Sequence, residues 1–418
     1  MTKSLSTYVV VGAGQAGGRA VEAMRAAGFN GRVALIGEEA YPPYERPPLS
    51  KKLLTGEVEV ETTYLNPVEF YADGDIEFMA GVRAESLDVE ARRLGLSSGA
   101  EVVFDKLLLA TGGRVRRLAV PGAALAGVFY VHTIDDSLAL RAALAGARSV
   151  VAVGGGYLGL EAAAAARVMG LEVTVVEREA NLLDRVAAPE IGRVVGDLHA
   201  RHGTRVMTGA DVAAIEGEGR VSGVRLADGT VLAADAVVVS IGIIPNTELA
   251  EAAGCEVGDG IVVDEFGETT VPGIYAAGDV ANHPNGFLGR TLRLESWQNA
   301  QNQAIAAARA MCGAPVPYNE VPWFWSDQYG VNIQLAGVPE RWDDIVFRGD
   351  PGTGAFSAFY LLEGRVVGVT GFNAAPDVRF GRKLIEARAA VDAETLKNPD
   401  VKLKDLVRQT VSTAAAAG

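Results

Sequence analysis

Two apolar runs, each followed at once by a glycine-rich turn, are the clearest pattern in this chain. Residues 8–11 (Tyr-Val-Val-Val) precede Gly-Ala-Gly-Gln-Ala-Gly at 12–17, and residues 150–153 (Val-Val-Ala-Val) precede Gly-Gly-Gly-Tyr-Leu-Gly at 154–159. Both turns match Gly-x-Gly-x-x-Gly, and each opens an alanine-rich segment of helical character. The pattern predicts two strand–turn–helix units, one in each half of the chain.

Each half also contains a second apolar run that ends in glycine, at residues 105–112 and 235–242. Continuous runs of this kind are typical of strands buried on both faces of a parallel sheet. A generic α/β strand would explain the hydrophobicity of each run. It would not explain why both runs occupy the same place relative to their glycine-rich turns, so we expect a repeated nucleotide-binding unit.

The residue types in the repeat favour binding of a dinucleotide. The first glycine permits the tight turn, the second lets the backbone approach a pyrophosphate, and the third lets helix and strand pack closely. The pyrophosphate then meets free N–H groups at the positive end of the helix. Glu38 lies 26 residues after Gly12, and Glu177 lies 23 residues after Gly154; a carboxylate there accepts hydrogen bonds from ribose hydroxyls. The alternative for either glutamate is a solvated strand end.

Charge and cysteine content narrow the function. The 418 residues carry a net charge of −14, which argues against nucleic acid and anionic membrane as partners. The chain has no apolar stretch long enough for a membrane span. Cys255 and Cys312 are far apart, so neither a local redox disulfide nor a metal cluster is expected. Few cysteines, and no export signal around residues 1–4, predict a cytoplasmic location.

The remaining segments have their own patterns. Residues 260–264 and 271–279 predict two strands joined by turns, followed by a glycine-rich loop, and a helix is expected over 295–313. Three prolines between 315 and 322 mark a linker. After it, apolar runs at 356–361 and 366–371 flank Glu-Gly, which is a hairpin signal. Helices near 382–390 and 403–411 complete an α+β segment.

Several longer motifs carry a family resemblance. They are Tyr-Glu-Arg-Pro-Pro-Leu-Ser-Lys at 44–51, Ala-Thr-Gly-Gly at 110–113, the second glycine motif through Glu161, Ala-Gly-Asp at 277–279 and Pro-Trp-Phe-Trp-Ser-Asp-Gln at 322–328. Over essentially its whole length the chain resembles the FAD-dependent, NADH-using ferredoxin reductases (putidaredoxin reductase-like) that serve Rieske-type oxygenases and bacterial cytochromes P450.

The resemblance implies an α/β fold of glutathione reductase-like type, with two Rossmann-like nucleotide-binding domains and a C-terminal α+β domain. Residues 1–113 and 245–322 would form a discontinuous FAD-binding domain. Residues 114–244 would bind NADH, and residues 323–418 would form the third domain. Whether the protein is a monomer or a homodimer stays open.

The resemblance also implies which residues bind the cofactors. For FAD these are Gly12, Gly14, Ala16, Gly17, Glu38, Arg46, Lys51, Ala84, Thr111, Gly278, Asp279 and Trp297. For NADH they are Gly154, Gly156, Leu158, Gly159, Glu161, Glu177, Arg185 and Gly242. Asp279 would bond the ribityl chain, and Ala84 would act through its backbone. His132 stands where relatives usually carry an arginine facing the flavin nucleotide; the alternative is an ordinary strand-end histidine.

Glu177 favours NADH over NADPH on physical grounds. A 2′-phosphate beside a carboxylate pairs like charges, which at ~4 Å costs about 1 kcal/mol in water and about 4 kcal/mol near a protein surface. Arg178 follows directly and would weaken this preference if it faced the phosphate. The simpler interpretation is that Arg178 is exposed to solvent or stacks on adenine.

Lys51, Glu161 and Trp325 are the candidate catalytic residues. In relatives, the lysine that matches Lys51 approaches the reactive edge of the flavin and pairs with a glutamate, here Glu161, which could also orient the nicotinamide. Trp325, with Trp323, is the candidate for the exit side, since indoles pack on flat cofactors and shield them from water. The alternatives are a surface lysine, a structural helix acid and core tryptophans.

The expected reaction is hydride transfer from NADH to FAD, followed by single-electron transfer to a [2Fe-2S] ferredoxin. An acidic ferredoxin would need a local basic face on this acidic chain. The candidates are Arg290, Arg293, Arg309, Arg379, Arg382, Lys383, Lys402, Lys404 and Arg408. Two other functions stay open: an NADH-dependent quinone or small-molecule reductase or oxidase, and a redox-sensing binding flavoprotein.

Overall fold

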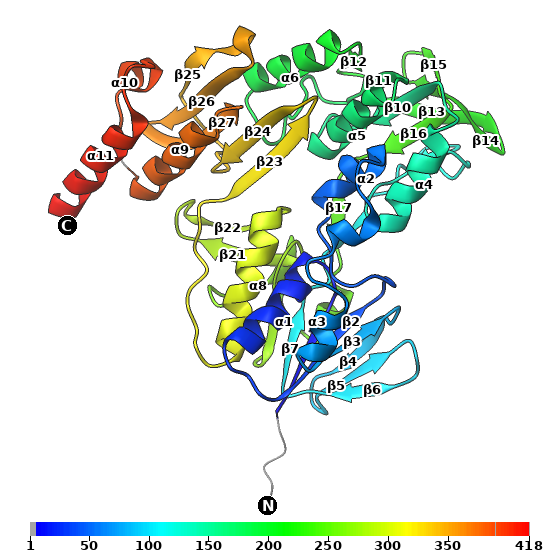
Figure 1. The fold of residues 1–418 in the computed structure, drawn as a ribbon, viewed down its shortest axis with the longest axis vertical. Helices are drawn as coiled ribbons and strands as arrows, with labels where there is room; N and C mark the ends of the chain where they lie inside the picture. Colours follow the sequence, from blue (N-terminus) through cyan, green and yellow to red (C-terminus); the bar gives the residue numbers. More distant parts are fainter. Residues whose placement is uncertain (1–5, 389, 418) are drawn as a thin grey trace, which may run out of the picture. The chain divides into compact units, whose positions relative to one another are not determined.

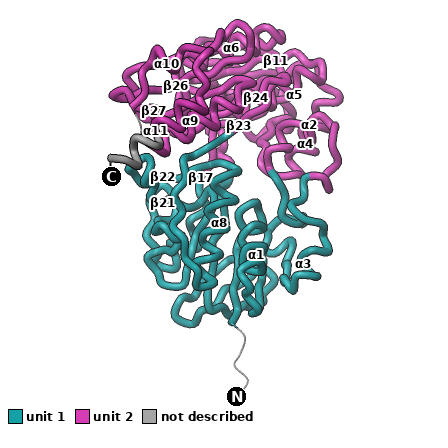
Figure 2. The backbone as a smooth tube through the Cα atoms, turned by 60° about the vertical axis from the view of Figure 1, so that its left-hand side comes forward, with its two compact units in different colours: residues 1–45, 63–114, 244–324 teal, residues 46–62, 115–243, 325–418 magenta. Residues whose placement is uncertain are grey.

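The computed structural model describes residues 6–388 and 390–417. Residues 1–4, on which the prediction of no export signal rests, lie outside this range. The chain divides into two compact units. The first comprises residues 1–45, 63–114 and 244–324, and the second comprises residues 46–62, 115–243 and 325–418 (Figure 2).

A five-stranded parallel sheet forms the centre of the first unit (Figure 1). Its strand order is β20 (Ile274–Ala276), β7 (Lys106–Leu109), β1 (Thr7–Val11), β2 (Arg32–Gly37) and β3 (Ile76–Ala80). Helices α1 (Gln15–Ala26) and α8 (Trp297–Met311) pack against each other, and α3 (Glu69–Asp73) packs near β3. The helix expected over 295–313 is therefore confirmed.

Side-chain alternation along β1 gives this sheet two cores. Tyr8 and Val10 pack with α1 and α8, whereas Val9 and Val11 face the opposite side. That opposite side is covered in part by an antiparallel sheet of β4 (Ala84–Asp88), β5 (Arg93–Leu96) and β6 (Glu101–Val103). Successive side chains of a strand point to opposite faces, so one apolar run supplies both cores.

The return segment of the first unit differs from the sequence prediction. It contains α7 (Glu248–Ala252) and a four-stranded sheet of β18 (Val257–Gly258), β19 (Gly260–Val262), β21 (Ala281–Asn285) and β22 (Arg290–Arg293). The prediction of a glycine-rich loop after Asp279 is wrong, because β21 and β22 form an antiparallel pair there. The two strands expected at 260–264 and 271–279 exist as β19 and β20, but in different sheets.

The second unit repeats the parallel sheet. Its order is β12 (Arg205–Met207), β11 (Glu172–Val176), β10 (Ser149–Val153), β16 (Ala236–Val239) and β9 (Val128–Phe129), with α4 (Ile134–Leu144), α5 (Tyr157–Val168) and α6 (Pro189–Arg201). Strand β10 lies between β11 and β16, as β1 lies between β2 and β7. The predicted repeat is thus present in space, and the 105–112 and 235–242 runs form equivalent strands.

Smaller elements complete this part of the second unit. Strands β13 (Val212–Glu218), β14 (Arg220–Leu226) and β15 (Val231–Ala233) form an antiparallel sheet. The segment 46–62 contains η1 (Pro47–Ser50), α2 (Lys52–Thr55) and most of η2 (Val60–Thr63). The chain crosses between the units within the short strands β8 (Gly113–Val115) and β17 (Ile243–Pro245), and also after residues 45, 62 and 324.

The C-terminal segment is the predicted α+β structure. Its sheet has the order β23 (Trp323–Gln328), β24 (Val331–Ala336), β27 (Arg365–Phe372), β26 (Ala355–Leu362) and β25 (Asp344–Asp350). The predicted hairpin is confirmed as β26 and β27, and both turn residues, Glu363 and Gly364, have positive φ. Helices follow at α9 (Ala375–Ala387), α10 (Ala393–Lys397) and α11 (Leu403–Ala417). Helix α9 begins earlier than expected, because Pro376 serves in its first turn.

Contacts group the chain differently from the predicted domains. The segment 46–62, predicted to belong to the FAD-binding domain, lies in the second unit together with residues 115–243 and 325–418. The three-part division stays a prediction. Among the described residues, no helix has the length and apolar character needed to cross a bilayer.

His283 on β21 is an unusual core residue. It is almost completely buried beside the ring of Tyr318, and neither ring nitrogen has a hydrogen-bond partner. Burial disfavours the charged imidazolium and lowers the pKa of His283 to about 4. Burial also lowers the pKa of His199 on α6.

We expect His283 to make folding sensitive to acid. The unfolded imidazole titrates near pH 6.5, so below that pH the unfolded state binds a proton that the native state refuses. The free energy of unfolding is then intact above about pH 6.5 and falls, by ~3 kcal/mol from this group, as the pH drops towards 4. Urea unfolding of wild type and His283→Phe at pH 7.5 and 4.5 tests this. The variant should lose less stability in acid, and an equal loss would contradict the prediction.

Candidate functional site

In the first glycine turn, backbone segments pack so closely that they leave no room for a side chain. Gly12 has a φ of +106°, and a Cβ there would lie 2.1 Å from the carbonyl oxygen of Ala110. A Cβ on Gly17 would lie 1.8 Å from the oxygen of Gly12. Gly14 is the extended N-cap of α1, and no side chain caps it. The first N–H groups of the helix are therefore available to a ligand.

The second turn has the same construction. Gly154 has a φ of +111°, and its Cβ would lie 2.1 Å from the oxygen of Ser240; a Cβ on Gly159 would lie 2.2 Å from the oxygen of Gly154. By contrast, no atom lies within 4 Å of a Cβ placed on Gly156. Because protein atoms do not explain the glycine at 156, the space beside it suits a ligand.

Gln15 gives an independent sign of a ligand in the first unit. Its side chain is 8% exposed at the start of α1, and neither amide atom has a hydrogen-bond partner. Buried polar groups are nearly always hydrogen-bonded in native proteins. The glycine cradle and this unsatisfied amide together fit a polar dinucleotide such as FAD.

Some of the predicted FAD residues of the first unit lie near the start of α1. Gly278, with a φ of +83°, stands so close to Ala16 that its Cβ would lie 2.9 Å from the Ala16 Cβ. The Gly278 N–H donates to Gln303 Oε1 at 2.9 Å, and the Asp279 carbonyl accepts from Arg293 at 3.0 Å. Trp297 is the first residue of α8. These contacts fix the Gly278–Asp279 turn beside α1.

Three other predicted FAD residues have less informative surroundings. Thr111 donates from Oγ1 to the Asn246 carbonyl at 2.7 Å. Ala84 begins β4, and Glu38 is exposed at the end of β2. Their roles toward FAD stay predictions.

Glu177 is held more firmly than Glu38. Its Oε2 accepts from the Gly155 N–H at 2.5 Å, and its Oε1 accepts from the Glu179 N–H at 2.8 Å. Each oxygen retains a lone pair for a ribose hydroxyl. Arg178 is exposed and forms an ion pair with Glu179 at 3.0 Å, in line with the solvent-facing interpretation of its side chain.

The remaining predicted NADH residues also belong to the second unit. Leu158 is exposed near the start of α5, and Gly242 has a φ of +94°. Arg185 is exposed, and its Nη2 lies 3.8 Å from where a Gly242 Cβ would stand. Arg46 and Lys51, predicted for FAD, lie in this unit as well.

His132 acts in the structure through its backbone. Its carbonyl accepts a hydrogen bond from the Arg46 guanidinium, and its N–H donates to Asp136 at 3.1 Å, just ahead of the Thr133 cap of α4. Arg46 is thus tied to this turn of the second unit. No role of His132 toward a cofactor follows from these contacts.

Lys51 and Glu161 form the buried ion pair that the resemblance implies. Lys51 Nζ lies 2.8 Å from Glu161 Oε1, and their side chains are only 16% and 5% exposed. The Lys51 ammonium also stands 6.0 Å from the centre of the Trp325 ring. The structure therefore brings together all three candidate catalytic residues within one unit.

Sequence reasoning missed the hydroxyl groups that complete this site. Ser326 Oγ donates to Glu161 Oε1 and Ser50 Oγ donates to Glu161 Oε2, both at 2.6 Å. Both serines are buried, and both belong to the specific motifs at 44–51 and 322–328. The available signal was alternation: along β23, the buried Ser326 and Gln328 alternate with the more exposed Trp325 and Asp327.

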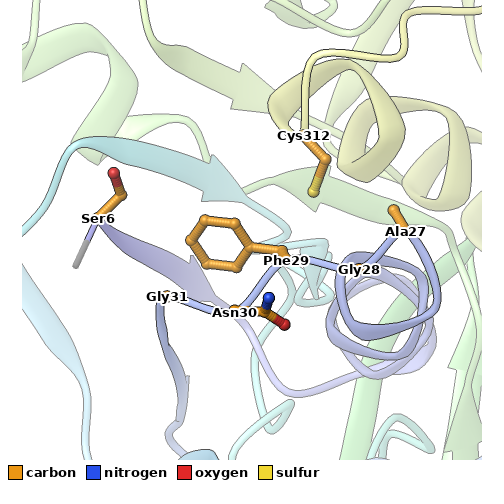
Figure 3. Close-up of a pocket in the computed structure, with 7 residues that line it drawn as sticks. All are labelled: Ser6, Ala27, Gly28, Phe29, Asn30, Gly31 and Cys312. Atoms are coloured by element: carbon orange, nitrogen blue, oxygen red, sulfur yellow. The ribbon is translucent and has the colours of Figure 1, made fainter.

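The one pocket described in Figure 3 lies elsewhere. It is an open hollow of about 300 Å³ lined by Ser6, Ala27, Gly28, Phe29, Asn30, Gly31 and Cys312. Ser6 precedes β1, residues 27–31 follow α1 and Cys312 follows α8, so the pocket lies at the amino end of β1. Dinucleotides bind at the carboxyl ends of parallel strands, so it is not the dinucleotide site. Cys255 and Cys312 are both free, and no metal-ligating cluster occurs among the described residues.

Comparison with known proteins shows which family this chain belongs to. The pyridine nucleotide-disulphide oxidoreductase profile matches residues 6–304, and the reductase C-terminal profile matches residues 323–407. The chain belongs to the pyridine nucleotide-disulphide oxidoreductase family. The predicted fold class and the predicted family resemblance are confirmed.

Individual relatives match over nearly their whole lengths. The chain is 43% identical to the 5,5′-dehydrodivanillate O-demethylase ferredoxin reductase subunit of Sphingobium sp., covering 95% of this chain and 97% of the relative. Among solved structures, the ferredoxin reductase for the CYP199A2 system of Rhodopseudomonas palustris superposes with a TM-score of 0.93 at 40% identity, covering 96% of this chain and 100% of that one. Putidaredoxin reductase in its covalent complex with putidaredoxin gives 0.94 at 36% identity, covering 98% and 100%.

Substitutions at Gly154 and Gly156 should distinguish an effect on folding from an effect on NADH binding. Gly154→Ala should destabilise the protein by about 2–4 kcal/mol, because its Cβ would meet the Ser240 backbone. Gly156→Ala should leave stability unchanged, since its Cβ meets nothing, yet raise the KM for NADH roughly tenfold by occupying the space of the pyrophosphate. Urea unfolding and NADH titration of both variants test this. An unchanged KM in Gly156→Ala would contradict the assignment.

Proposed function

We propose that this protein is an FAD-dependent NADH:ferredoxin oxidoreductase that supplies single electrons to a [2Fe-2S] ferredoxin of an oxygenase system. The observation that carries the proposal is the full-length similarity to ferredoxin reductases, including the C-terminal segment. The relatives serve an O-demethylase, a CYP199A2 system and putidaredoxin. Which kind of oxygenase this protein serves, Rieske-type or cytochrome P450, is left to experiment.

FAD, when bound, can accept a hydride from NADH and release the two electrons one at a time. The chain's task is to bind and orient both nucleotides. The α1 turn with Gln15 and the Gly278–Asp279 turn would hold FAD. The α5 turn and Glu177 would hold NADH by its pyrophosphate and its adenosine ribose.

Lys51 and Glu161 are the residues we assign to the reaction centre. A buried ammonium stabilises electron density that develops nearby, and Glu161 fixes its position at 2.8 Å. Trp325, beside Lys51, would cover the cofactor on the exit side and exclude water.

The two cysteines do not form a redox pair. Cys255 packs in one core cluster of the first unit and Cys312 against another, and burial raises the pKa of both thiols. Free thiols also fit the cytoplasmic location that we propose. We infer that electrons leave directly for an external acceptor.

The basic residues suggested for ferredoxin docking differ in availability. Arg293 is 10% exposed and pairs with Asp259 and Glu295, each at 2.9 Å, so it serves the β22 region rather than a partner. Arg382 and Arg408 pair with neighbouring acids on their own helices. Lys402 and Lys404 are both exposed at the start of α11, which makes them more suitable candidates.

The decisive assay is NADH-driven reduction of cytochrome c by the FAD-loaded protein, with and without a [2Fe-2S] ferredoxin. We expect the ferredoxin to accelerate the reaction at least tenfold, because in the proposed reaction it carries single electrons from the flavin to cytochrome c. An unstimulated rate, with fast reduction of a quinone, would instead favour the small-molecule reductase. Slow turnover with every acceptor would favour the redox-sensing flavoprotein.

Glu177 should set the preference for NADH. In Glu177→Gln the amide oxygen still accepts hydrogen bonds, but the charge that repels a 2′-phosphate is gone. We expect kcat/KM for NADPH relative to NADH to rise roughly tenfold, as removal of one like-charge contact at a protein surface allows. Steady-state kinetics with both coenzymes measure the ratio. Arg178→Ala is the control, because Arg178 pairs with Glu179. An unchanged ratio in Glu177→Gln would count against the ribose role.

A further inference from the structure

Within the second unit, a line of buried polar side chains continues from the Lys51–Glu161 pair. Ser326 Oγ, which donates to Glu161, lies 3.0 Å from Gln328 Nε2. Gln328 Oε1 lies 2.9 Å from His199 Nε2. Ser326, Gln328 and His199 are each at most 1% exposed. The line joins helix α5, strand β23 and helix α6.

Hydrogen-bond chemistry fixes the direction of every bond in this line. The Glu161 carboxylate only accepts, so the Ser326 hydroxyl hydrogen points to it. Ser326 Oγ must then accept from the Gln328 amide nitrogen, which turns the amide oxygen toward His199. His199 therefore donates through Nε2–H, and its Nδ1 has no hydrogen-bond partner. Burial lowers the pKa of His199, which agrees with this neutral form.

The result is an arrangement in which three donors converge on one carboxylate, and the hydrogen bonds behind Ser326 run in the same direction. Glu161 Oε1 accepts from Lys51 and Ser326, and Oε2 accepts from Ser50. Without the hydroxyl of Ser326, Oε1 would keep only the ammonium of Lys51, and Glu161 would be held by two donors instead of three. Aligned hydrogen bonds in a low-dielectric interior also polarise and strengthen one another.

We propose that Ser326, oriented by Gln328 and His199 behind it, is a positioning residue that fixes Glu161 and, through it, the ammonium of Lys51. The inference rests on the proposed function, since it assigns the C-terminal strand β23 a part in hydride transfer. It explains why Ser326 and Gln328 turn inward on this strand while Trp325 remains beside Lys51.

The main test measures reduction of the FAD-loaded protein by NADH in anaerobic stopped flow. Ser326→Ala should slow the limiting rate constant of hydride transfer roughly tenfold, which is the usual effect of losing one charge-assisted hydrogen bond. The dissociation constant for NADH should change less than twofold. Ser326→Thr keeps the hydroxyl and should restore the rate.

Ser357→Ala is the matched control. Ser357 is also fully buried in the C-terminal sheet and donates to a carboxylate, Asp377, at 2.8 Å. It lies outside the proposed site, so its loss should leave hydride transfer unchanged. If Ser326→Ala does not fold, Gln328→Met removes the orienting amide instead and should slow the step about threefold.

Two measurements distinguish positioning from mere packing. In a double-mutant cycle, adding Ser326→Ala to Glu161→Gln should cost no further rate, because the serine acts through Glu161. The infrared carboxylate band of Glu161, identified by subtraction of Glu161→Gln, should shift in Ser326→Ala but not in Ser357→Ala. The proposal would be overturned if the two substitutions reduced the rate independently, so that their effects multiplied in the double mutant. An unshifted carboxylate band in Ser326→Ala would also overturn it. If NADH did not reduce even the wild-type protein, the proposed function would fail. The infrared band alone would then show whether Ser326 positions Glu161.

Discussion

The nucleotide-binding units depend on one steric constraint, the absence of a side chain where a strand turns into its helix. At Gly12 and Gly154 a Cβ would lie 2.1 Å from the backbone oxygen of the neighbouring strand. The third glycine of each motif brings the helix equally close to the first. With glycine there, the helix starts directly behind the central strand, and its free N–H groups face the carboxyl edge of the sheet. Any other residue would move the helix and close that position.

The two copies of the turn use this constraint differently. In the first unit, Gln15 leaves a buried amide without a partner at the helix start. In the second unit, Glu177 accepts a hydrogen bond from the N–H of Gly155 and so stabilises the turn. The first turn thus leaves a buried amide for a ligand to satisfy, whereas the second is completed by its own strand end. We infer that the first suits a tightly held cofactor, whereas the second is preformed for a coenzyme that must leave after each turnover.

The sequence predicts what depends on local pattern. Strands β1, β10, β7 and β16, both glycine turns and the β26–β27 hairpin follow from periodicity and turn residues that lie close together in the chain. The β21–β22 pair escaped prediction because Pro284 lies within β21 and glycine follows it, so the local signal reads as a loop. Alternation along β23 marks Ser326 and Gln328 as buried, but the bonds of the two serines to Glu161 and of Gln328 to His199 join segments far apart in sequence, and no spacing encodes such a contact.

The buried ion pair of Lys51 and Glu161 is better explained by function than by stability. Removing two charges from water costs several kcal/mol per ion, and well-packed apolar residues often replace such pairs without loss of stability. Here the chain adds two serine hydroxyls to the same carboxylate and backs one of them with an amide and an imidazole. Packing alone would not require donors aligned in this way. A reaction that needs an ammonium at one fixed point would require such aligned donors. An ion pair held by several hydrogen bonds reorganises less, so it loses less of its electrostatic stabilisation.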